Sequence, residues 1–399
     1  MKHRFSFQNT DFASLWQQEG AVAAGNLFVF SSDSGLGAGK QRQPRDAPEN
    51  TAFAAGELRY AATKRRLVRK HFADLRKLRQ MDPRRILITG SSGFYGRALV
   101  GAIRRTWPEA EILGLDVIAP RTDAPNQFEI CDVTNPQLRE WAVRFQPDTI
   151  LHLAFVVNPM RDEERMHQIN VEGSRQLLAV AAELKPARLF VSSSATAYGA
   201  WPDNPVPMTE DQPLRARPDY RYSSDKVQVE ELLADYAQSH PETIVSWTRP
   251  CIIYGPGVSN FMTPLFTVPP VLTLPGGDNP PMQFVHLEDV ADATIAILQS
   301  ESKGPFNVAP PDWVTIKDLA KMSGRMAVPV PFIVCRALTA CWWALRLPIF
   351  LFPAPLWNFI RFPWVVAPNR LTNELGYKFK YTSDQVIRLL LKDAGKLRT

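Results

Sequence analysis

The chain has 399 residues, enough for a complete α/β domain with additional segments. Its 46 Lys and Arg exceed its 40 Asp and Glu by six, and the excess is concentrated in two stretches, residues 57–85 and 321–370. Four cysteines without metal-type spacing and six scattered histidines disfavour a metal site and a disulfide scaffold, so we expect reduced thiols and no metal.

The composition also bears on the location of the protein. A membrane span needs roughly 20 apolar residues, but the most apolar window, residues 347–360, is shorter and contains three prolines. The first residues lack the long apolar core of a signal peptide. We therefore expect a soluble, cytoplasmic protein without nucleic-acid partners, and peripheral contact with a membrane stays open.

Residues 1–80 are predicted to be an extension of the folded chain. Residues 1–56 mix Ser, Gly, Gln, Asn and Pro without periodicity, which is typical of disorder. Val68, Phe72, Leu75 and Leu78 then recur at helical spacing among basic residues, which predicts a basic amphipathic helix. This helix is either an anchor for a membrane or partner, or an ordinary solvated segment.

A glycine-rich turn follows the first predicted strand, residues 85–89. Gly90 permits a tight turn, Gly93 lets a pyrophosphate approach the backbone, and Gly96 lets the next helix pack closely on the strand. The helix N-terminus offers free N–H groups to phosphates. A second strand ends in Asp116, about 20 residues further on, where a carboxylate can hold a ribose diol. Together these features predict a dinucleotide site.

Strands and helices alternate through the next two hundred residues, which predicts a parallel sheet covered by helices on both faces. The further expected strands are 111–115, 128–130, 149–154, 188–192, 243–248 and 304–308, and the main helices are 93–105, 136–145, 165–183 and 222–238. Ligands of such sheets bind at the carboxyl ends of the strands.

Two of these strand ends carry further polar candidates. Asp132 follows the third strand, where its carboxylate either accepts from an adenine amino group or caps a helix. His152 ends the fourth strand, followed by the small and apolar Leu153 and Ala154, which leave room for a ribose. A single histidine in this position is more often a hydrogen-bonded core residue than a catalyst.

The fifth strand end and the helix after it carry the candidate catalytic groups. Tyr222 and Lys226 are four residues apart, so both lie on one helix face and the ammonium can approach the phenol ring. We expect the nearby cation to favour the phenolate, so that Tyr222 exchanges a proton while hydride moves at a nicotinamide. Ser194 would then donate a hydrogen bond to the substrate oxygen.

In this order, the motifs of residues 84–391 resemble the extended short-chain dehydrogenase/reductase superfamily, in its NAD-dependent epimerase/dehydratase branch. The motifs are Gly90-x-x-Gly93-x-x-Gly96, Asp116, Asp132-Val133, His152-Leu153-Ala154, Asn170-Val171-Glu172-Gly173, residues 192–199, Tyr222-x-x-x-Lys226, Arg249-Pro250, Tyr254-Gly255-Pro256 and residues 284–291.

The resemblance implies a Rossmann-type doubly wound sheet over residues 81–250 and a smaller, mostly helical substrate-binding region over residues 251–399. It implies Ser194 (or its neighbour Thr196), Tyr222 and Lys226 as catalytic residues, and a homodimer formed through the Tyr222 helix and the helix before it. NAD is favoured over NADP by Asp116, although Arg121 is close enough to meet a 2′-phosphate. The implied cofactor-binding residues are Gly90, Ser92, Gly93, Phe94, Tyr95, Gly96, Asp116, Asp132, Val133, Leu153, Ala154, Asn170, Tyr222 and Lys226.

The substrate region departs from the sugar-nucleotide enzymes of this branch. Ile252 and Ile253 stand where those enzymes usually have an Asn, and Met282 stands where an Arg usually clamps a pyrophosphate. Arg215, Arg217 and Arg221 are possible substitutes for that Arg. Three functions stay open: a dehydrogenase of apolar alcohols similar to hydroxysteroid dehydrogenases, a nucleotide-sugar 4-epimerase or dehydratase, and a non-catalytic NAD-binding scaffold.

Residues 328–366 form an apolar segment rich in Trp and Pro, with arginines in between and no carboxylate. Two interpretations stay open. The segment is either a helical lid packed on the substrate region, or it meets a bilayer interface through residues 335–364.

Overall fold

The computed structural model describes residues 82–120, 124–258, 261–346 and 352–398. The extension expected over residues 1–80, with its amphipathic helix, and Arg121 lie outside the described residues. Among the helices described, none combines the length and the apolar character that crossing a membrane requires.

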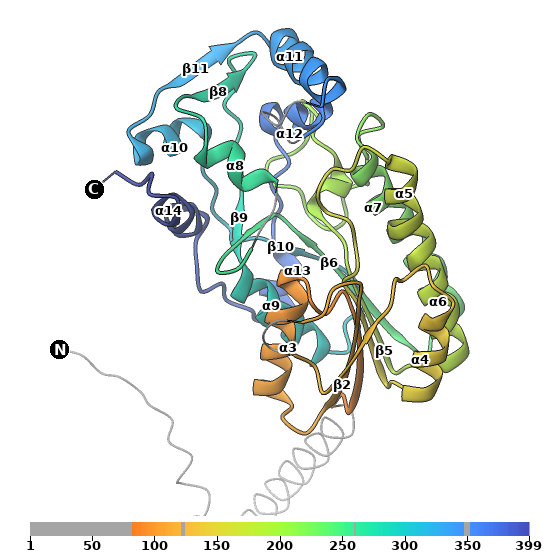
Figure 1. The fold of residues 1–399 in the computed structure, drawn as a ribbon. Coiled ribbons are helices and arrows are strands. Elements are labelled where there is room, and N and C mark those ends of the chain that lie inside the picture. Colours follow the sequence, from red (N-terminus) through yellow and green to blue (C-terminus); the bar gives the residue numbers. More distant parts are fainter. Residues whose placement is uncertain (1–81, 121–123, 259–260, 347–351, 399) are drawn as a thin grey trace, which may run out of the picture. The chain divides into compact units, whose positions relative to one another are not determined.

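All seven predicted strands form one parallel sheet, in the order β10-β6-β5-β4-β1-β2-β3 (Figure 1). Their bounds are β1 (Arg85–Thr89), β2 (Glu111–Asp116), β3 (Gln127–Ile130), β4 (Thr149–His152), β5 (Arg188–Ser192), β6 (Ile244–Pro250) and β10 (Gly304–Val308). This order is the doubly wound Rossmann order extended by one strand, and the chain reverses direction across the sheet between β1 and β4. A ligand crevice is therefore expected where these two strands end.

Alternation of side chains along each strand builds two cores, one on each face of the sheet. Ile86 and Ile88 pack under α3 (Phe94–Thr106), which lies beside α9 (Leu287–Leu298). Leu87 faces the other way and joins the core under α4 (Gln137–Phe145), α6 (Gly173–Leu184) and α7 (Arg221–Ser239). Both sheet faces are therefore covered, as the near-continuous apolar strands predict.

The helix predicted over residues 165–183 is observed as three consecutive pieces. These are α5 (Glu163–His167), a π-helical turn η1 (Gln168–Glu172) and α6. The turn contains Asn170, whose amide oxygen accepts from the Val156 N–H at 2.8 Å and whose amide nitrogen donates to Asp225 at 3.2 Å. It therefore ties the loop after β4 to α7.

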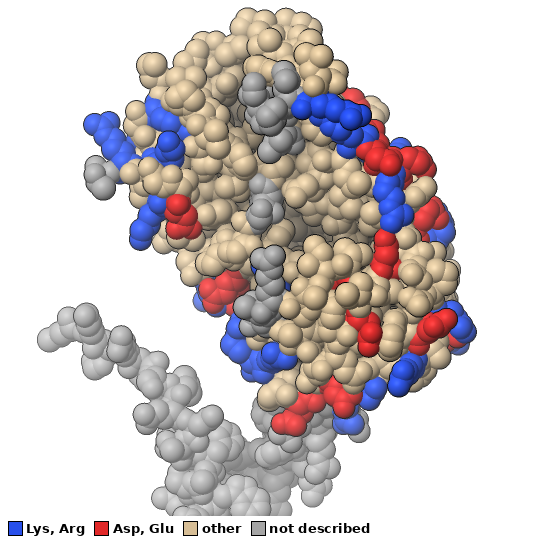
Figure 2. Space-filling view, in the orientation of Figure 1, with Lys and Arg blue, Asp and Glu red and all other residues tan. Residues whose placement is uncertain are grey.

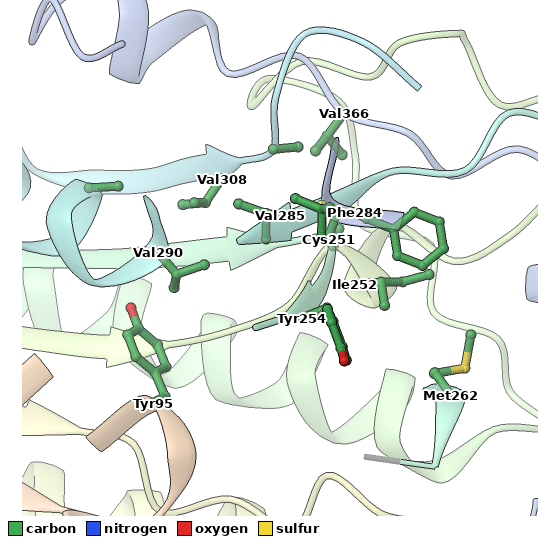
Figure 3. Close-up of a cluster of buried hydrophobic side chains, with 14 of the residues drawn as sticks. Tyr95, Cys251, Ile252, Tyr254, Met262, Phe284, Val285, Val290, Val308 and Val366 are labelled. Atoms are coloured by element: carbon green, nitrogen blue, oxygen red, sulfur yellow. The ribbon is translucent and has the colours of Figure 1, made fainter. Parts of the chain in front are cut away.

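The region beyond the sheet has short strands that the sequence analysis did not predict, paired as β7 with β9 and β8 with β11. Figure 3 shows part of its core, where Phe284 and Val285 of β9 lie near Ile252 of β7 and Met262 of α8. The bounds are η2 (Ala195–Tyr198), β7 (Ile252–Tyr254), α8 (Met262–Thr267), β8 (Leu272–Pro275), β9 (Phe284–His286), α10 (Ile316–Ser323), β11 (Ala327–Val330), α11 (Phe332–Ala344), η3 (Ala354–Leu356), α12 (Trp357–Arg361), α13 (Asn369–Asn373) and α14 (Ser383–Asp393).

Candidate active site

The turn after β1 needs glycine at two of its three positions. Gly90 has a φ of +73°, and a Cβ atom there would lie 2.7 Å from the backbone nitrogen of Ala154. A Cβ on Gly96 would lie 2.3 Å from the carbonyl oxygen of Gly90, so α3 packs too closely for any other residue. At Gly93 a Cβ would meet only this same oxygen, at 3.4 Å. Packing within the protein therefore does not by itself require glycine at this third position.

A cavity of about 270 Å³ opens beside this turn, between the ends of β1, β2 and β4. Asp116 lies in its wall, and its carboxylate accepts from the Ser92 N–H at 2.9 Å and from the Ile118 N–H at 3.2 Å. The turn and the acidic strand end, 24 residues apart in sequence, are thus joined directly. Asp132, Val133, Leu153 and Ala154 complete the predicted residues that line this cavity.

The two polar candidates at the neighbouring strand ends have different roles. Asp132 accepts from the backbone and hydroxyl of Thr134 and forms an ion pair with Arg165 at 2.7 Å. The helix-cap interpretation is wrong, because α4 begins after Pro136. His152 is buried between the hydroxyls of Thr89 (2.7 Å) and Ser174 (3.0 Å), and burial lowers its pKa to about 3. It is a hydrogen-bonded core histidine.

A second cavity, of about 190 Å³, adjoins the first at Gly90, Gly93, Leu153 and Phe155. It brings Phe94, Tyr95 and Gly96 at the start of α3 together with Ser194 and the Tyr222–Lys226 pair. Every residue predicted for cofactor binding or catalysis therefore lines one of two joined cavities, with the exception of Asn170. That residue is buried behind the β4 loop and holds the loop instead.

The candidate catalytic side chains are buried and connected. Tyr222 is 7% exposed and lines the same cavity as Ser194, whose side chain acts to lower the pKa of the phenol. The ammonium of Lys226 lies 5.6 Å from the centre of the Tyr222 ring and donates to the Ser192 carbonyl at 2.7 Å. It also lies 3.1 Å from the centre of the Phe155 ring. The predicted approach of ammonium to phenol is confirmed.

We expected the nearby Lys226 ammonium to favour the phenolate of Tyr222, and this expectation is wrong for the protein alone. Burial raises the pKa of Tyr222 to about 12, against a smaller lowering by the Ser194 side chain. Burial also lowers the pKa of Lys226 well below its usual value. Desolvation is thus the largest influence on the pKa of both groups, and in the protein alone the phenol carries its proton at neutral pH.

A buried ion pair lies directly behind the serine-rich strand end. The Glu230 carboxylate accepts from the Ser193 hydroxyl at 2.5 Å, from the Trp247 indole at 2.7 Å and from the Arg249 guanidinium at 2.6 Å. Glu230 lies one turn beyond Lys226 on α7, so the same helix positions Tyr222, Lys226 and this pair. The network fixes the backbone that carries Ser194.

Apart from Ser192, Ser193 and Thr196, the rest of the second cavity is mostly apolar, and Lys226 is the one charged side chain in its lining as described. Met282 is buried, and Arg215, Arg217 and Arg221 do not line the cavity, since Asp203, Asp219 and Glu164 bind them. Phe155 and Tyr220 also line this cavity but were not among the residues predicted from the sequence. The position of Phe155 directly after Ala154 could have indicated its place in the site. The apolar wall comprises Val157, Tyr220, Pro250, Cys251, Ile252, Ile253, Phe261, Met262, Leu356, Phe359 and Trp364.

Comparison with known proteins agrees with this arrangement. An uncharacterised protein of Mycobacterium tuberculosis is 24% identical over 310 residues, which cover 75% of this chain and 81% of the relative. Among solved structures, dTDP-glucose 4,6-dehydratase of Bacillus anthracis, in complex with NAD, has a TM-score of 0.59 at 18% identity and covers 77% of this chain and 96% of its own. UDP-glucose 4-epimerase of Thermotoga maritima, with UDP-glucose, has a TM-score of 0.60 at 17% identity, with 77% and 97% covered.

At these identities the solved structures show a shared fold. The family model supplies the assignment, because it matches residues 86–309, which include the glycine turn, Asp116, Ser194, Tyr222 and Lys226. The chain therefore belongs to the NAD-dependent epimerase/dehydratase family of enzymes.

Proposed function

We propose that this protein is an NAD-dependent oxidoreductase that transfers hydride at a secondary alcohol or ketone of an apolar substrate. One observation carries the proposal. Tyr222 and Ser194 share a cavity with the glycine turn, and beyond Lys226 and the polar strand end of Ser192, Ser193 and Thr196 the wall of that cavity is mostly apolar. Such a wall suits a hydroxysteroid-like molecule better than a charged one.

The residues around the two cavities fit a dinucleotide. Gly90 and Gly93, which carry no side chain, line both cavities, and the first cavity presents the Asp116 carboxylate. Asp116 would accept from a ribose diol and repel a 2′-phosphate, which favours NAD over NADP. Bound NAD supplies or accepts the hydride. Asp132, Val133, Leu153 and Ala154 would line its adenosine half, and Phe94, Tyr95, Tyr222 and Lys226 its nicotinamide half.

The side chains of the protein manage the proton. In the reducing direction, Tyr222 donates its phenolic proton to the ketone oxygen as that oxygen becomes the alcohol. Ser194, in the same cavity as Tyr222, donates to the same oxygen and stabilises its developing charge. In the oxidising direction, Tyr222 must first lose its proton. Since burial raises its pKa to about 12, the protein alone is better prepared for reduction at neutral pH.

A nucleotide-sugar 4-epimerase or dehydratase is the second candidate, favoured by the likeness of fold to such enzymes. The same Tyr and Lys would serve it. A nucleotide-sugar pyrophosphate, however, needs cationic partners, and Lys226 is the one cation that lines the described cavity. A non-catalytic NAD-binding scaffold would not need Ser194, Tyr222 and Lys226 in contact.

The experiment uses the full chain with NAD and two panels of substrates. Apolar secondary alcohols, hydroxysteroids among them, are tested for NADH release, and UDP-glucose is tested for conversion to UDP-galactose. The proposal expects stoichiometric NADH from at least one apolar alcohol. Sugar interconversion without net NADH would establish the epimerase instead, and inactivity in both directions with tight NAD binding would favour the scaffold.

The same proposal includes the expectations for assembly and location. We expect a homodimer formed through α6 and α7, a cytoplasmic location and peripheral contact with a membrane through part of residues 335–364.

A further inference from the structure

The helix α11 presents an apolar surface where a surface helix is usually polar. It buries Cys335 and Thr339, while almost all of the side chains directed outward are hydrophobic. Ile333 is 73% exposed and Leu338 is 52% exposed. We call this surface the apolar face of α11, and its exposed residues are Ile333, Val334, Ala337, Leu338, Ala340, Cys341 and Ala344.

This face belongs to the most apolar part of the described surface. Eight of the thirteen large hydrophobic residues that are exposed lie in the lobe of α8, β8, β11 and α11, or directly beside these elements. In Figure 2 the upper end of the molecule, where Figure 1 places α11 and β11, is almost free of charged atoms. The eight residues are Val268, Val271, Met326, Val328, Ile333, Val334, Leu338 and Leu345.

The chain segment that carries this face is basic, and one of its arginines pairs with an acidic residue from another segment. Residues 321–370 include six Lys and Arg and no Asp or Glu. Arg336 lies at the edge of the face, where it reaches Asp219 at 3.3 Å, and Arg346 is exposed just beyond the helix. An apolar helix face with the exposed Arg346 just beyond its end is complementary to a bilayer with anionic headgroups.

The buried side of α11 continues into the wall of the second cavity. The Thr339 hydroxyl accepts from the Trp357 indole at 2.8 Å, so α11 packs on α12 and η3. Phe359 of α12 and Leu356 of η3 line the cavity itself. The described part of residues 335–364 thus has two sides. The outer side is the exposed apolar face of α11, and the inner side, formed by η3 and α12, covers the cavity.

We propose that the apolar face of α11 docks the protein on a lipid bilayer, with the helix lying in the plane of the interface. A second copy of the chain is a poorer occupant. A helix of 13 residues is about 20 Å long and about 10 Å wide, and covers far less than the roughly 800 Å² per partner of a stable dimer. Insertion of a few side chains into a bilayer needs no such area.

Docking at this face also indicates where the substrate comes from. Only one layer, η3 and α12, separates α11 from the apolar cavity. The substrate is therefore an alcohol or ketone of the lipid class that passes from the bilayer into the cavity. The assignment of a lipid-class substrate rests on the function proposed above, whereas the docking of α11 on a bilayer does not.

Flotation of the full chain with vesicles of phosphatidylcholine and phosphatidylglycerol tests the docking. The test variant is Ile333→Ser/Leu338→Ser, and the matched control is Ile130→Ser/Val206→Ser, two exposed apolar residues outside the lobe. Salt of about 1 M screens the basic stretch at residues 57–85 but not apolar insertion. At that salt we expect the test variant to bind about 100-fold more weakly, about tenfold for each side chain, and the control to bind like wild type.

Equal binding by the test and control variants, or no binding by wild type, would overturn the docking. So would conversion of a dimer to a monomer by the test variant in sedimentation, because the occupant would then be a second copy. NADH formation is followed with a long-chain alcohol in vesicles and a short-chain alcohol in solution. Slower turnover of the long-chain alcohol alone in the test variant supports lipid delivery, and equal slowing of both contradicts it. If wild type oxidises neither alcohol, the proposed function fails while the flotation result stands.

Discussion

The buried pair of Glu230 and Arg249 gives the sharpest prediction of stability. Glu230 is 3% exposed and Arg249 is 5% exposed, and two separate hydrogen bonds from the guanidinium reach the carboxylate within 3.0 Å. Glu230→Ala leaves the Arg249 charge buried without a partner and also removes the acceptor of Ser193 and Trp247. Loss of one member of such a pair costs about 3–5 kcal/mol of the free energy of unfolding.

Urea unfolding followed by tryptophan fluorescence measures this loss. Glu111→Ala is the matched control, because it removes a carboxylate whose partner, Arg85, is 41% exposed. We expect the control to cost at most about 1 kcal/mol. The double change Glu230→Met/Arg249→Met should recover about half of the loss, since no unpaired charge is then buried. A Glu230→Ala variant as stable as the control would refute this account of the network behind Ser194.

Three further predictions concern the cofactor and the phenol. Gly96→Ala should lower the free energy of unfolding by about 1–3 kcal/mol and abolish NAD binding, because its Cβ would lie 2.3 Å from the Gly90 oxygen. The control Gly101→Ala on the same helix should raise the free energy of unfolding by up to about 1 kcal/mol. Thermal unfolding compares the two variants, and equal melting temperatures would contradict the close packing. Asp116→Ala should weaken NAD binding about tenfold or more and reduce the preference over NADP, as measured by fluorescence titration, and an unchanged preference would remove Asp116 from the ribose site. The rate of alcohol oxidation should rise about tenfold per pH unit between about pH 7 and pH 10, because the phenolate fraction of Tyr222 increases about tenfold per pH unit at pH values below its pKa of about 12. A plateau of the rate near pH 8 would contradict the raised pKa of Tyr222.

The sheet and the glycine turn could be predicted because their signals are local. Strands β1, β4 and β5 each have an apolar run, Gly90 has a positive φ in a tight turn, and Gly96 is required by a contact with Gly90 close in sequence. The short strands β7 and β9 have three residues each, too few for a periodic pattern. They form because distant segments pair, which a local pattern does not report.

The sequence predicted which residues form the candidate site more fully than it predicted the pKa values of those residues. The spacing of Tyr222 and Lys226 gave their proximity, but the pKa of Tyr222 depends on burial by segments far along the chain. The partner of Arg249 was not evident for the same reason, because Glu230 lies 19 residues away on another element. The exposure of the apolar face of α11 could not be predicted either, because the sequence of an apolar helix has the same pattern whether the helix faces a core or the surface.

The central claim is that Tyr222, which shares a cavity with Ser194 and the glycine turn, moves the proton that accompanies hydride transfer. Its most direct measurement is the turnover of Tyr222→Phe with a substrate identified for wild type, together with its affinity for NAD. The account predicts unchanged NAD binding and turnover slower by about 10²–10⁴-fold. Turnover equal to that of wild type would contradict it.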